Sequence, residues 1–128
     1  MNIHGIHHVA IICSNIEISR RFYTEIIGLT IIKETYREER NSYKLDLALG
    51  ENYIIELFSF PSPPKRINFP EATGLRHIAF EVSSLQEAVD ELIQKGILVE
   101  DIRIDPTTGK KYTFFNDPDD LPIELYER

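Results

Sequence analysis

The chain has 128 residues, a length that suits one compact domain or two small fused modules, and its 42% hydrophobic content is enough for a packed core. The net charge of -7 argues against nucleic acid as the main partner, because phosphate binding needs a basic face. No apolar run approaches the roughly 20 residues that cross a bilayer, and no signal peptide is expected at the N-terminus. The single cysteine, Cys13, forms no intrachain disulfide and fits a reducing compartment, so we expect a cytoplasmic protein.

A strand followed by a helix is predicted at the start of the chain. Residues 6–13 are apolar and rich in β-branched side chains, which is typical of a strand. Ser14 and Glu17 form a Ser-x-x-Glu capping box that predicts a helix start. Gly28 is expected to end this helix. Its apolar face is predicted from residues four apart: Ile18, Phe22 and Ile26.

Three strands and a linker are expected next. The strands are predicted at residues 29–36, 43–49 and 53–60, with a hairpin turn at residues 50–52. Residues 61–70 contain four prolines, which exclude regular structure there. Residues 61–74 are therefore interpreted as a connection between two modules.

The same order of elements then recurs. Residues 75–82 predict a strand, Ser83 and Ser84 begin a capped helix, and Gly96 lies near its end. Three further strands are predicted at residues 98–104, 111–116 and 121–126. We therefore expect an α+β fold of two tandem βαβββ modules, at about residues 1–60 and 75–128.

An internal repeat supports this division. The residues His8, Val9, Ala10 and Ile11 match a second group at an offset of 69: His77, Ile78, Ala79 and Phe80. The residues Ile55, Glu56, Leu57 and Phe58 match a later group at an offset of 68: Ile123, Glu124, Leu125 and Tyr126. Each module thus carries one matched histidine and one matched glutamate.

Strand alternation predicts that these four side chains avoid the helix. Side chains along a strand point to opposite faces in turn. In both first strands the large apolar residues share one face, while the histidine shares the other with a small alanine. In both last strands the glutamate lies opposite the isoleucine and leucine beside it. If each sheet curls with its helix outside, the four polar residues face one concave surface, whereas Cys13 lies on the helix side as a buried hydrophobe.

Two imidazoles and two carboxylates in one cleft are suited to binding a divalent metal ion. Such a set leaves two positions of an octahedron open for neighbouring oxygens of a substrate, and the metal would stabilise charge on them. A lone strand histidine or glutamate more often faces core or water. The metal hypothesis depends on the matched pairing of His8, Glu56, His77 and Glu124.

The chain resembles the glyoxalase I, fosfomycin-resistance and extradiol-dioxygenase superfamily, also called vicinal oxygen chelate proteins. The resemblance rests on the duplicated module, the two histidines at strand starts and the ending from Phe114 to Leu125. The segments 54–61 and 74–77 are most similar to the small bacterial glyoxalase-like YaeR subfamily. The resemblance implies an open eight-stranded mixed sheet or barrel around the metal, with helices outside, formed within one chain or across a homodimer.

The resemblance also implies roles for individual residues. His8, Glu56 and His77 would be metal ligands, and Glu124 would be both ligand and catalytic base in a lyase or isomerase that works through a metal-stabilised enediolate. The metal would be zinc or nickel, with cobalt, manganese or iron(II) permitted by the same ligands. The residues that hold glutathione in such enzymes are not identifiable, so a thiol requirement stays open. Many relatives have glycine where this chain has Asp120, which predicts a positive φ there.

Three basic residues on the second and third predicted strands are candidates for holding an anionic group of a small-molecule substrate: Arg37, Arg40 and Lys44. The alternative interpretation is a solvated cluster that neutralises itself with nearby glutamates.

Other functions of the same fold stay open. A ring-cleaving dioxygenase would use iron(II) with two histidines and one carboxylate, and Glu56 as a ligand would crowd that site. A transferase that modifies an epoxide antibiotic would use three of the four residues. A non-catalytic small-molecule binder of the bleomycin-resistance type would generally lack the complete set.

Overall fold

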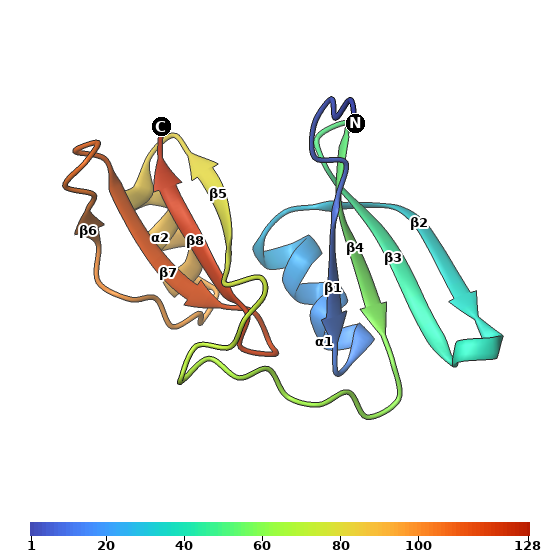
Figure 1. Cartoon of the computed structure of the whole chain (residues 1–128). Helices are drawn as coiled ribbons and strands as arrows, with labels where there is room; N and C mark the ends of the chain where they lie inside the picture. The colour runs from blue at the N-terminus through green and yellow to red at the C-terminus, as the bar shows by residue number, and fades with distance from the viewer. The chain divides into compact units, whose positions relative to one another are not determined.

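The computed structural model describes residues 1–128, which divide into two compact units, Met1–Lys65 and Arg66–Arg128. We call them module 1 and module 2. Each module contains a strand, a helix and three further strands in that order (Figure 1), so the predicted α+β class and tandem βαβββ arrangement are confirmed. None of the helices has the length and apolar character needed to span a membrane.

Module 1 contains a four-stranded mixed sheet. Its helical segments are α1 (Ile16–Arg21), η1 (Phe22–Ile26) and the short η2 (Glu38–Arg40), and its strands are β1 (Val9–Cys13), β2 (Thr30–Arg37), β3 (Ser42–Leu49) and β4 (Asn52–Ser59). The strand order is β1-β4-β3-β2, with β1 parallel to β4 and the other neighbours antiparallel. The first and last strands of the module therefore lie side by side. Each sheet has one face against its own helix, and we call the opposite face the open face.

The first helix begins one residue later than predicted. Asn15, not Ser14, is the N-cap, and its Oδ1 accepts hydrogen bonds from the backbone N–H of Glu17 and Ile18 at 3.1 Å each. Asparagine competes well for this position because its side-chain oxygen reaches the same donors that serine would satisfy.

The apolar face of this helix also differs from the prediction. After Arg21 the segment continues as one turn of π-helix, so the spacing of four no longer selects one face. Ile18 is 56% exposed, whereas Phe22 and Tyr23 are buried. They lie in the core of module 1 with the apolar residues of its strands, namely Ile11, Cys13, Leu45, Leu47, Ile55 and Leu57. Cys13 is buried as predicted, and Gly28 ends the segment with a φ of 90°.

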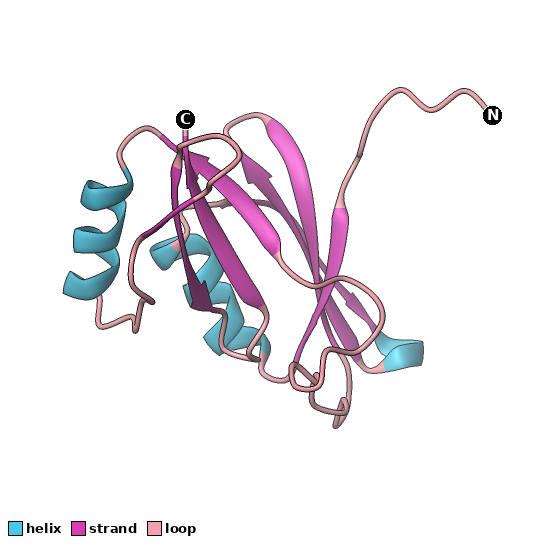
Figure 2. Ribbon diagram, turned by 60° about the vertical axis from the view of Figure 1, so that its left-hand side comes forward, coloured by secondary structure: helices cyan, strands magenta, loops and turns pink.

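Module 2 repeats this architecture. Its elements are β5 (Ile78–Val82), α2 (Leu85–Gln94), β6 (Arg103–Ile104), β7 (Lys111–Asn116) and β8 (Pro122–Glu127). The strand order is β5-β8-β7-β6, again with the first and last strands parallel. Ser84 caps α2 as predicted, and the helix buries Leu85, Val89 and Leu92. Figures 1 and 2 show α2 along one face of its own sheet.

Two strands of module 2 are shorter than predicted. The strand predicted at residues 75–82 begins only at Ile78, because the carbonyls of Leu75 and Arg76 accept hydrogen bonds from the Arg66 guanidinium instead of a strand partner. The strand predicted at residues 98–104 is limited to β6. Just before β6, the Glu100 carbonyl accepts a hydrogen bond from the Thr113 hydroxyl at 2.7 Å. In a longer β6 this carbonyl would accept from a backbone N–H of the neighbouring strand instead.

The turn before β8 contains the predicted positive φ. Asp120 has a φ of 64°, in the left-handed region. Its backbone N–H donates to the Asp117 carbonyl at 3.1 Å, and its carbonyl accepts from the Asn68 side chain at 2.8 Å. The second half of the proline-rich segment is thereby hydrogen-bonded to module 2.

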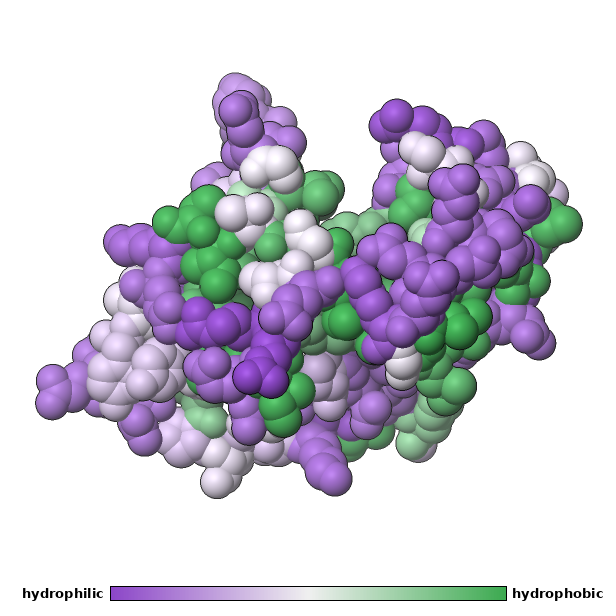
Figure 3. All heavy atoms as spheres, turned by 180° about the vertical axis from the view of Figure 1, so that it is seen from behind, coloured by the Kyte–Doolittle hydropathy of each residue, from purple (hydrophilic) through white to green (hydrophobic).

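Apolar side chains also reach the surface, and Figure 3 shows them as green areas among hydrophilic ones. In module 2, Leu98 is 92% exposed. Scattered exposed apolar residues are ordinary for a folded protein.

Candidate metal centre

In each module, a histidine and a glutamate meet on the open face of the sheet. In module 1, His8 Nε2 lies 3.3 Å from Glu56 Oε2. In module 2, His77 Nε2 lies 3.1 Å from Glu124 Oε2. The side chains are about equally accessible in the two pairs, at 34% and 35% for the histidines and 15% and 14% for the glutamates. The sequence repeat thus produces two histidine–glutamate pairs of the same geometry, and we call each pair a half-site.

The strand register explains why the pairs form. His8 and His77 each lie one residue before a strand, at the entrance to β1 and β5. Two residues later comes an alanine, and its parallel partner across the sheet is the glutamate: Ala10 with Glu56 and Ala79 with Glu124. The small alanine leaves space above the sheet, so the imidazole can approach the neighbouring carboxylate.

The distances fit two ligands of one metal ion. Ligand atoms about 2.0–2.2 Å from a divalent cation lie about 3 Å apart at adjacent octahedral positions and about 3.4 Å apart in a tetrahedron. The observed separations of 3.3 and 3.1 Å fall in this range. Imidazole nitrogen and carboxylate oxygen are also suitable donors for zinc, nickel and similar ions. No group of three or more such side chains gathers within either module, so each pair could supply two ligands at most.

The surroundings of Glu56 are polar. Its Oε1 accepts a hydrogen bond from the Tyr53 hydroxyl at 2.6 Å and lies 3.0 Å from Lys44 Nζ. Asp46, the cross-strand partner of Glu56, lies 3.3 Å from Lys44 Nζ, and its Oδ1 lies 3.1 Å from the Tyr53 oxygen as a second, more distant acceptor. The Tyr53 hydrogen bond lowers the pKa of Glu56, with Lys44 and His8 adding to the effect. Glu56 is thereby held as a carboxylate ion.

These contacts also shift the pKa values of Tyr53 and Lys44. Loss of hydration, together with the neighbouring carboxylates, raises the pKa of Tyr53, so its hydroxyl keeps the proton that it donates. The hydrogen bond to Glu56 raises the pKa of Lys44, which stays an ammonium group. The predicted substrate residue Lys44 therefore lies beside the half-site and is already paired with two carboxylates.

His7 contacts the other side of His8. Their Nδ1 atoms are 2.8 Å apart, and the His7 ring also meets Tyr53 edge-on. Because His8 uses Nδ1 for this contact, its Nε2 is the nitrogen that faces Glu56. Metal-binding histidines commonly use their second ring nitrogen in a hydrogen bond that fixes the ring. β1 begins only at Val9, so His7 lies just before the strand and is exposed.

The surroundings of Glu124 are aromatic instead. The cross-strand partner of Glu124 is Phe114, which meets the His77 ring edge-on with centroids 5.2 Å apart. Arg103 lies over the Phe114 ring at 5.4 Å. Within module 2, His77 is the polar side chain that Glu124 contacts. The two glutamates look equivalent in sequence but have different neighbours in the structure.

Arg37 and Arg40 lie farther along the open face of module 1. Arg37 lies over the Phe58 ring at 4.9 Å, and Arg40 lies over the Phe60 ring at 5.0 Å. The two rings are stacked, with centroids 5.9 Å apart. Neither guanidinium forms an ion pair with a carboxylate, so the predicted neutralisation by nearby glutamates is not seen for these two residues.

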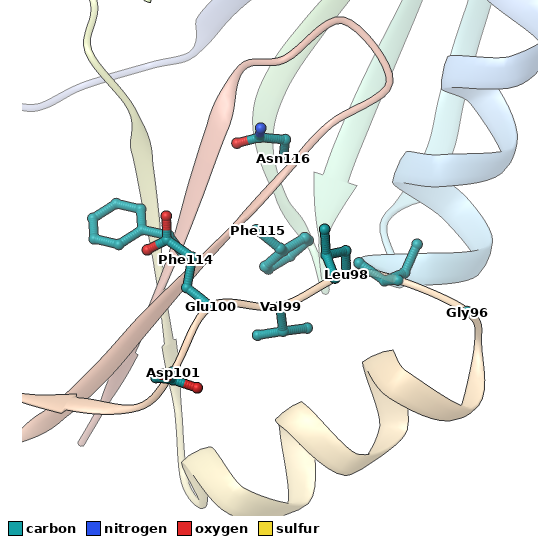
Figure 4. Close-up of a pocket in the computed structure, with 9 residues that line it drawn as sticks. Gly96, Leu98, Val99, Glu100, Asp101, Phe114, Phe115 and Asn116 are labelled. Atoms are coloured by element: carbon teal, nitrogen blue, oxygen red, sulfur yellow. The ribbon is translucent and has the colours of Figure 1, made fainter.

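An open pocket of about 710 Å³ lies in module 2 between residues 96–101 and β7. Figure 4 shows the lining side chains, including Leu98, Val99, Phe114 and Phe115. Phe114 also touches His77, so the pocket borders the half-site of this module.

The fold and the chain's relatives identify the family. The Glyoxalase/Bleomycin resistance protein/Dioxygenase superfamily matches residues 5–125, and the chain belongs to this superfamily. It is 62% identical over 128 residues to the uncharacterised protein YwkD of Bacillus subtilis (strain 168), covering 100% of both chains. It is 54% identical to the uncharacterised protein YaeR of Escherichia coli (strain K12), covering 96% of this chain and 95% of YaeR.

A solved structure agrees with this assignment. The glyoxalase family protein from Enterococcus faecalis is 47% identical, with a TM-score of 0.89 and coverage of 96% of this chain and 97% of that one. Relatives at 27% identity include proteins named 2-epi-5-epi-valiolone epimerase, from Actinomyces sp, and Glyoxylase I 4, from Arabidopsis thaliana. The resemblance drawn from the sequence is confirmed. The superfamily contains several kinds of enzyme, so the reaction has to be argued from the site.

Proposed function

We propose that the protein is a metal-dependent, glyoxalase I-like lyase or isomerase whose two half-sites together bind one divalent ion. The observation that supports this most strongly is the paired geometry, in which His8 with Glu56 and His77 with Glu124 reproduce the spacing of adjacent metal ligands. The substrate is a small molecule with neighbouring oxygens. The metal is zinc or nickel, or another ion that these ligands accept. A homodimer is part of the same proposal.

The metal and the four residues divide the chemistry. A bound ion would act as a Lewis acid that stabilises negative charge on substrate oxygens. His8, Glu56, His77 and Glu124 serve as ligands, and Glu124 is also the catalytic base. Glu124 has no neighbouring ammonium or hydroxyl in its module, so its carboxylate is the better candidate to remove a proton from a substrate carbon and return it to the adjacent carbon.

Arg37 and Arg40 fit a role in substrate binding. Each guanidinium has one surface on an aromatic ring and no carboxylate partner. A planar guanidinium placed in this way can bind a carboxylate or phosphate through two hydrogen bonds. We therefore assign them to an anionic group at the far end of the substrate, and we assign Lys44 a weaker role because Glu56 and Asp46 occupy it.

Metal loading tests whether the half-sites act together. Metal-stripped protein is titrated with zinc, nickel and cobalt, and the bound ion is counted by elemental analysis. One ion per chain is expected, and either His8→Ala or His77→Ala should remove it. Independent half-sites would instead give variants that each keep part of the binding, and no binding at any loading would favour a non-catalytic binder.

Turnover tests the role of Glu124. A screen of 2-oxoaldehydes with thiols should identify a substrate for the nickel or zinc form, whereas iron with oxygen uptake would favour a dioxygenase. With that substrate, Glu124→Gln should keep the fold and lower kcat by about 10²–10⁴-fold, the usual contribution of a general base. Tyr36→Phe is the control variant, because the Tyr36 hydroxyl donates to Asn41 and the change leaves both glutamates in place. Unchanged kcat in Glu124→Gln rules out the assigned role.

A further inference from the structure

The two oxygens of Glu56 have different environments. Oε1 accepts from the Tyr53 hydroxyl at 2.6 Å and from the Lys44 ammonium at 3.0 Å. A carboxylate oxygen has two lone pairs, so these two donors satisfy Oε1. Oε2 faces His8 Nε2 at 3.3 Å. The contacts therefore select one oxygen of Glu56 for a metal ion.

The duplication provides an internal comparison, because module 2 has different residues at the equivalent positions. The cross-strand partner of the glutamate is Asp46 in module 1 and Phe114 in module 2. Lys44, which pairs with Phe58, corresponds by register to Tyr112, which pairs with Tyr126. Tyr53, three residues before Glu56, corresponds to Leu121, three residues before Glu124.

We infer that Tyr53 is a positioning residue that holds Glu56 as a one-oxygen metal ligand, while Glu124 has no such support. The inference rests on the proposed function, since it concerns the same metal. A carboxylate held by a strong hydrogen bond loses little conformational freedom when the ion binds, so binding is tighter. Glu124 contacts His77 and has no equivalent hydrogen-bond donor to fix it. The two matched glutamates are thus specialised, one for holding the ion and the other for moving a proton.

Cobalt titration of the full chain tests the inference without a substrate. Metal-stripped wild type, Tyr53→Phe, Tyr36→Phe and Lys44→Met are titrated with Co²⁺ against a chelating dye, and the visible cobalt spectrum is recorded. Tyr53→Phe removes only the hydroxyl. We expect it to raise the Kd for Co²⁺ about 10–100-fold, the usual effect of losing a group that orients a ligand, and to change the cobalt spectrum.

The other variants separate positioning from structural support. Tyr36→Phe removes a comparable hydroxyl, which bonds Asn41 at 2.8 Å, and should leave both the Kd and the spectrum unchanged. Lys44→Met keeps the Tyr53 hydrogen bond and removes a positive charge 3.0 Å from Glu56, so the Kd should stay the same or fall. Lys44→Met also tests the inference if Tyr53→Phe folds poorly. If the Kd of Lys44→Met for Co²⁺ rises as much as is expected for Tyr53→Phe, the role is not specific to Tyr53 and the inference is contradicted.

The outcomes distinguish this inference from the proposed function. Wild type that binds no Co²⁺ overturns both. Wild type that binds Co²⁺ through His8 and His77, with an equal Kd in Tyr53→Phe, leaves the proposed metal site intact and overturns the positioning role.

Discussion

Replacing Asp120 with glycine should stabilise the protein. Asp120 has a φ of 64°, and an L-residue in this region costs about 1–2 kcal/mol. Glycine avoids that cost but loses about 0.5–1 kcal/mol more conformational entropy on folding. The backbone hydrogen bonds of Asp120 to Asp117 and Asn68 do not need its side chain. The net gain in the free energy of unfolding is therefore about 0.5–1 kcal/mol.

Thermal and urea unfolding measure this gain. For 128 residues, with an unfolding entropy of about 2.1 cal/mol/K per residue, it corresponds to a Tm increase of about 2–4 °C. Asp119→Gly is the matched control, because it removes the same charge from the same turn at a residue without positive φ. The control should lose about 0.5–1 kcal/mol. Equal effects of the two substitutions would refute the assignment of strain to Asp120.

Two further predictions concern module 1. Asn15→Ala should lower the free energy of unfolding by about 1 kcal/mol, because it removes the acceptor for two backbone N–H groups, and Ser14→Ala should cost less in the same urea assay. Arg20→Met should cost about 0.5 kcal/mol at pH 7 by removing the ion pair with Glu34, a value already reduced for solvent screening. Hydrogen bonding to Arg20 lowers the pKa of Glu34 in the folded protein. The stability that the ion pair contributes is therefore present above the ordinary glutamate pKa of 4.5, and it is lost as the pH falls through the lowered pKa of Glu34. Urea curves for wild type and Arg20→Met should therefore converge in acid, and a constant difference down to pH 2 would contradict the assignment.

The strand faces were predictable because alternation is a local rule. A strand has a side-chain period of two, so the buried Ile55 and Leu57 and the more accessible Glu56 follow directly from their order. The repeat then placed Glu124 on the corresponding face of β8. The helix of module 1 was less predictable, because a π-helical turn changes the period and buries Tyr23 instead of Ile18.

The neighbours of the half-sites could not be predicted from the repeat alone. Tyr53 reaches Glu56 within one strand, but its contact with Asp46 depends on the register between β3 and β4. That register shifts between Leu47 and Ala48, and no pattern in the sequence indicated the shift. The stacking of Arg37 on Phe58 likewise depends on two strands meeting. The sequence therefore identified the candidate ligands but not the side chains that distinguish one glutamate from the other.

The strand pairing has a consequence for synthesis of the chain. Every pairing of the first sheet joins residues between Val9 and Ser59, and β1 closes directly on β4. The first sheet therefore requires no residue that is translated after Ser59. A nascent chain can complete this sheet while its second half is still being made, because domains generally fold as units from the N-terminus during translation. The inner strands β4 and β3 then have both edges paired early, which limits their chance to associate with other nascent chains.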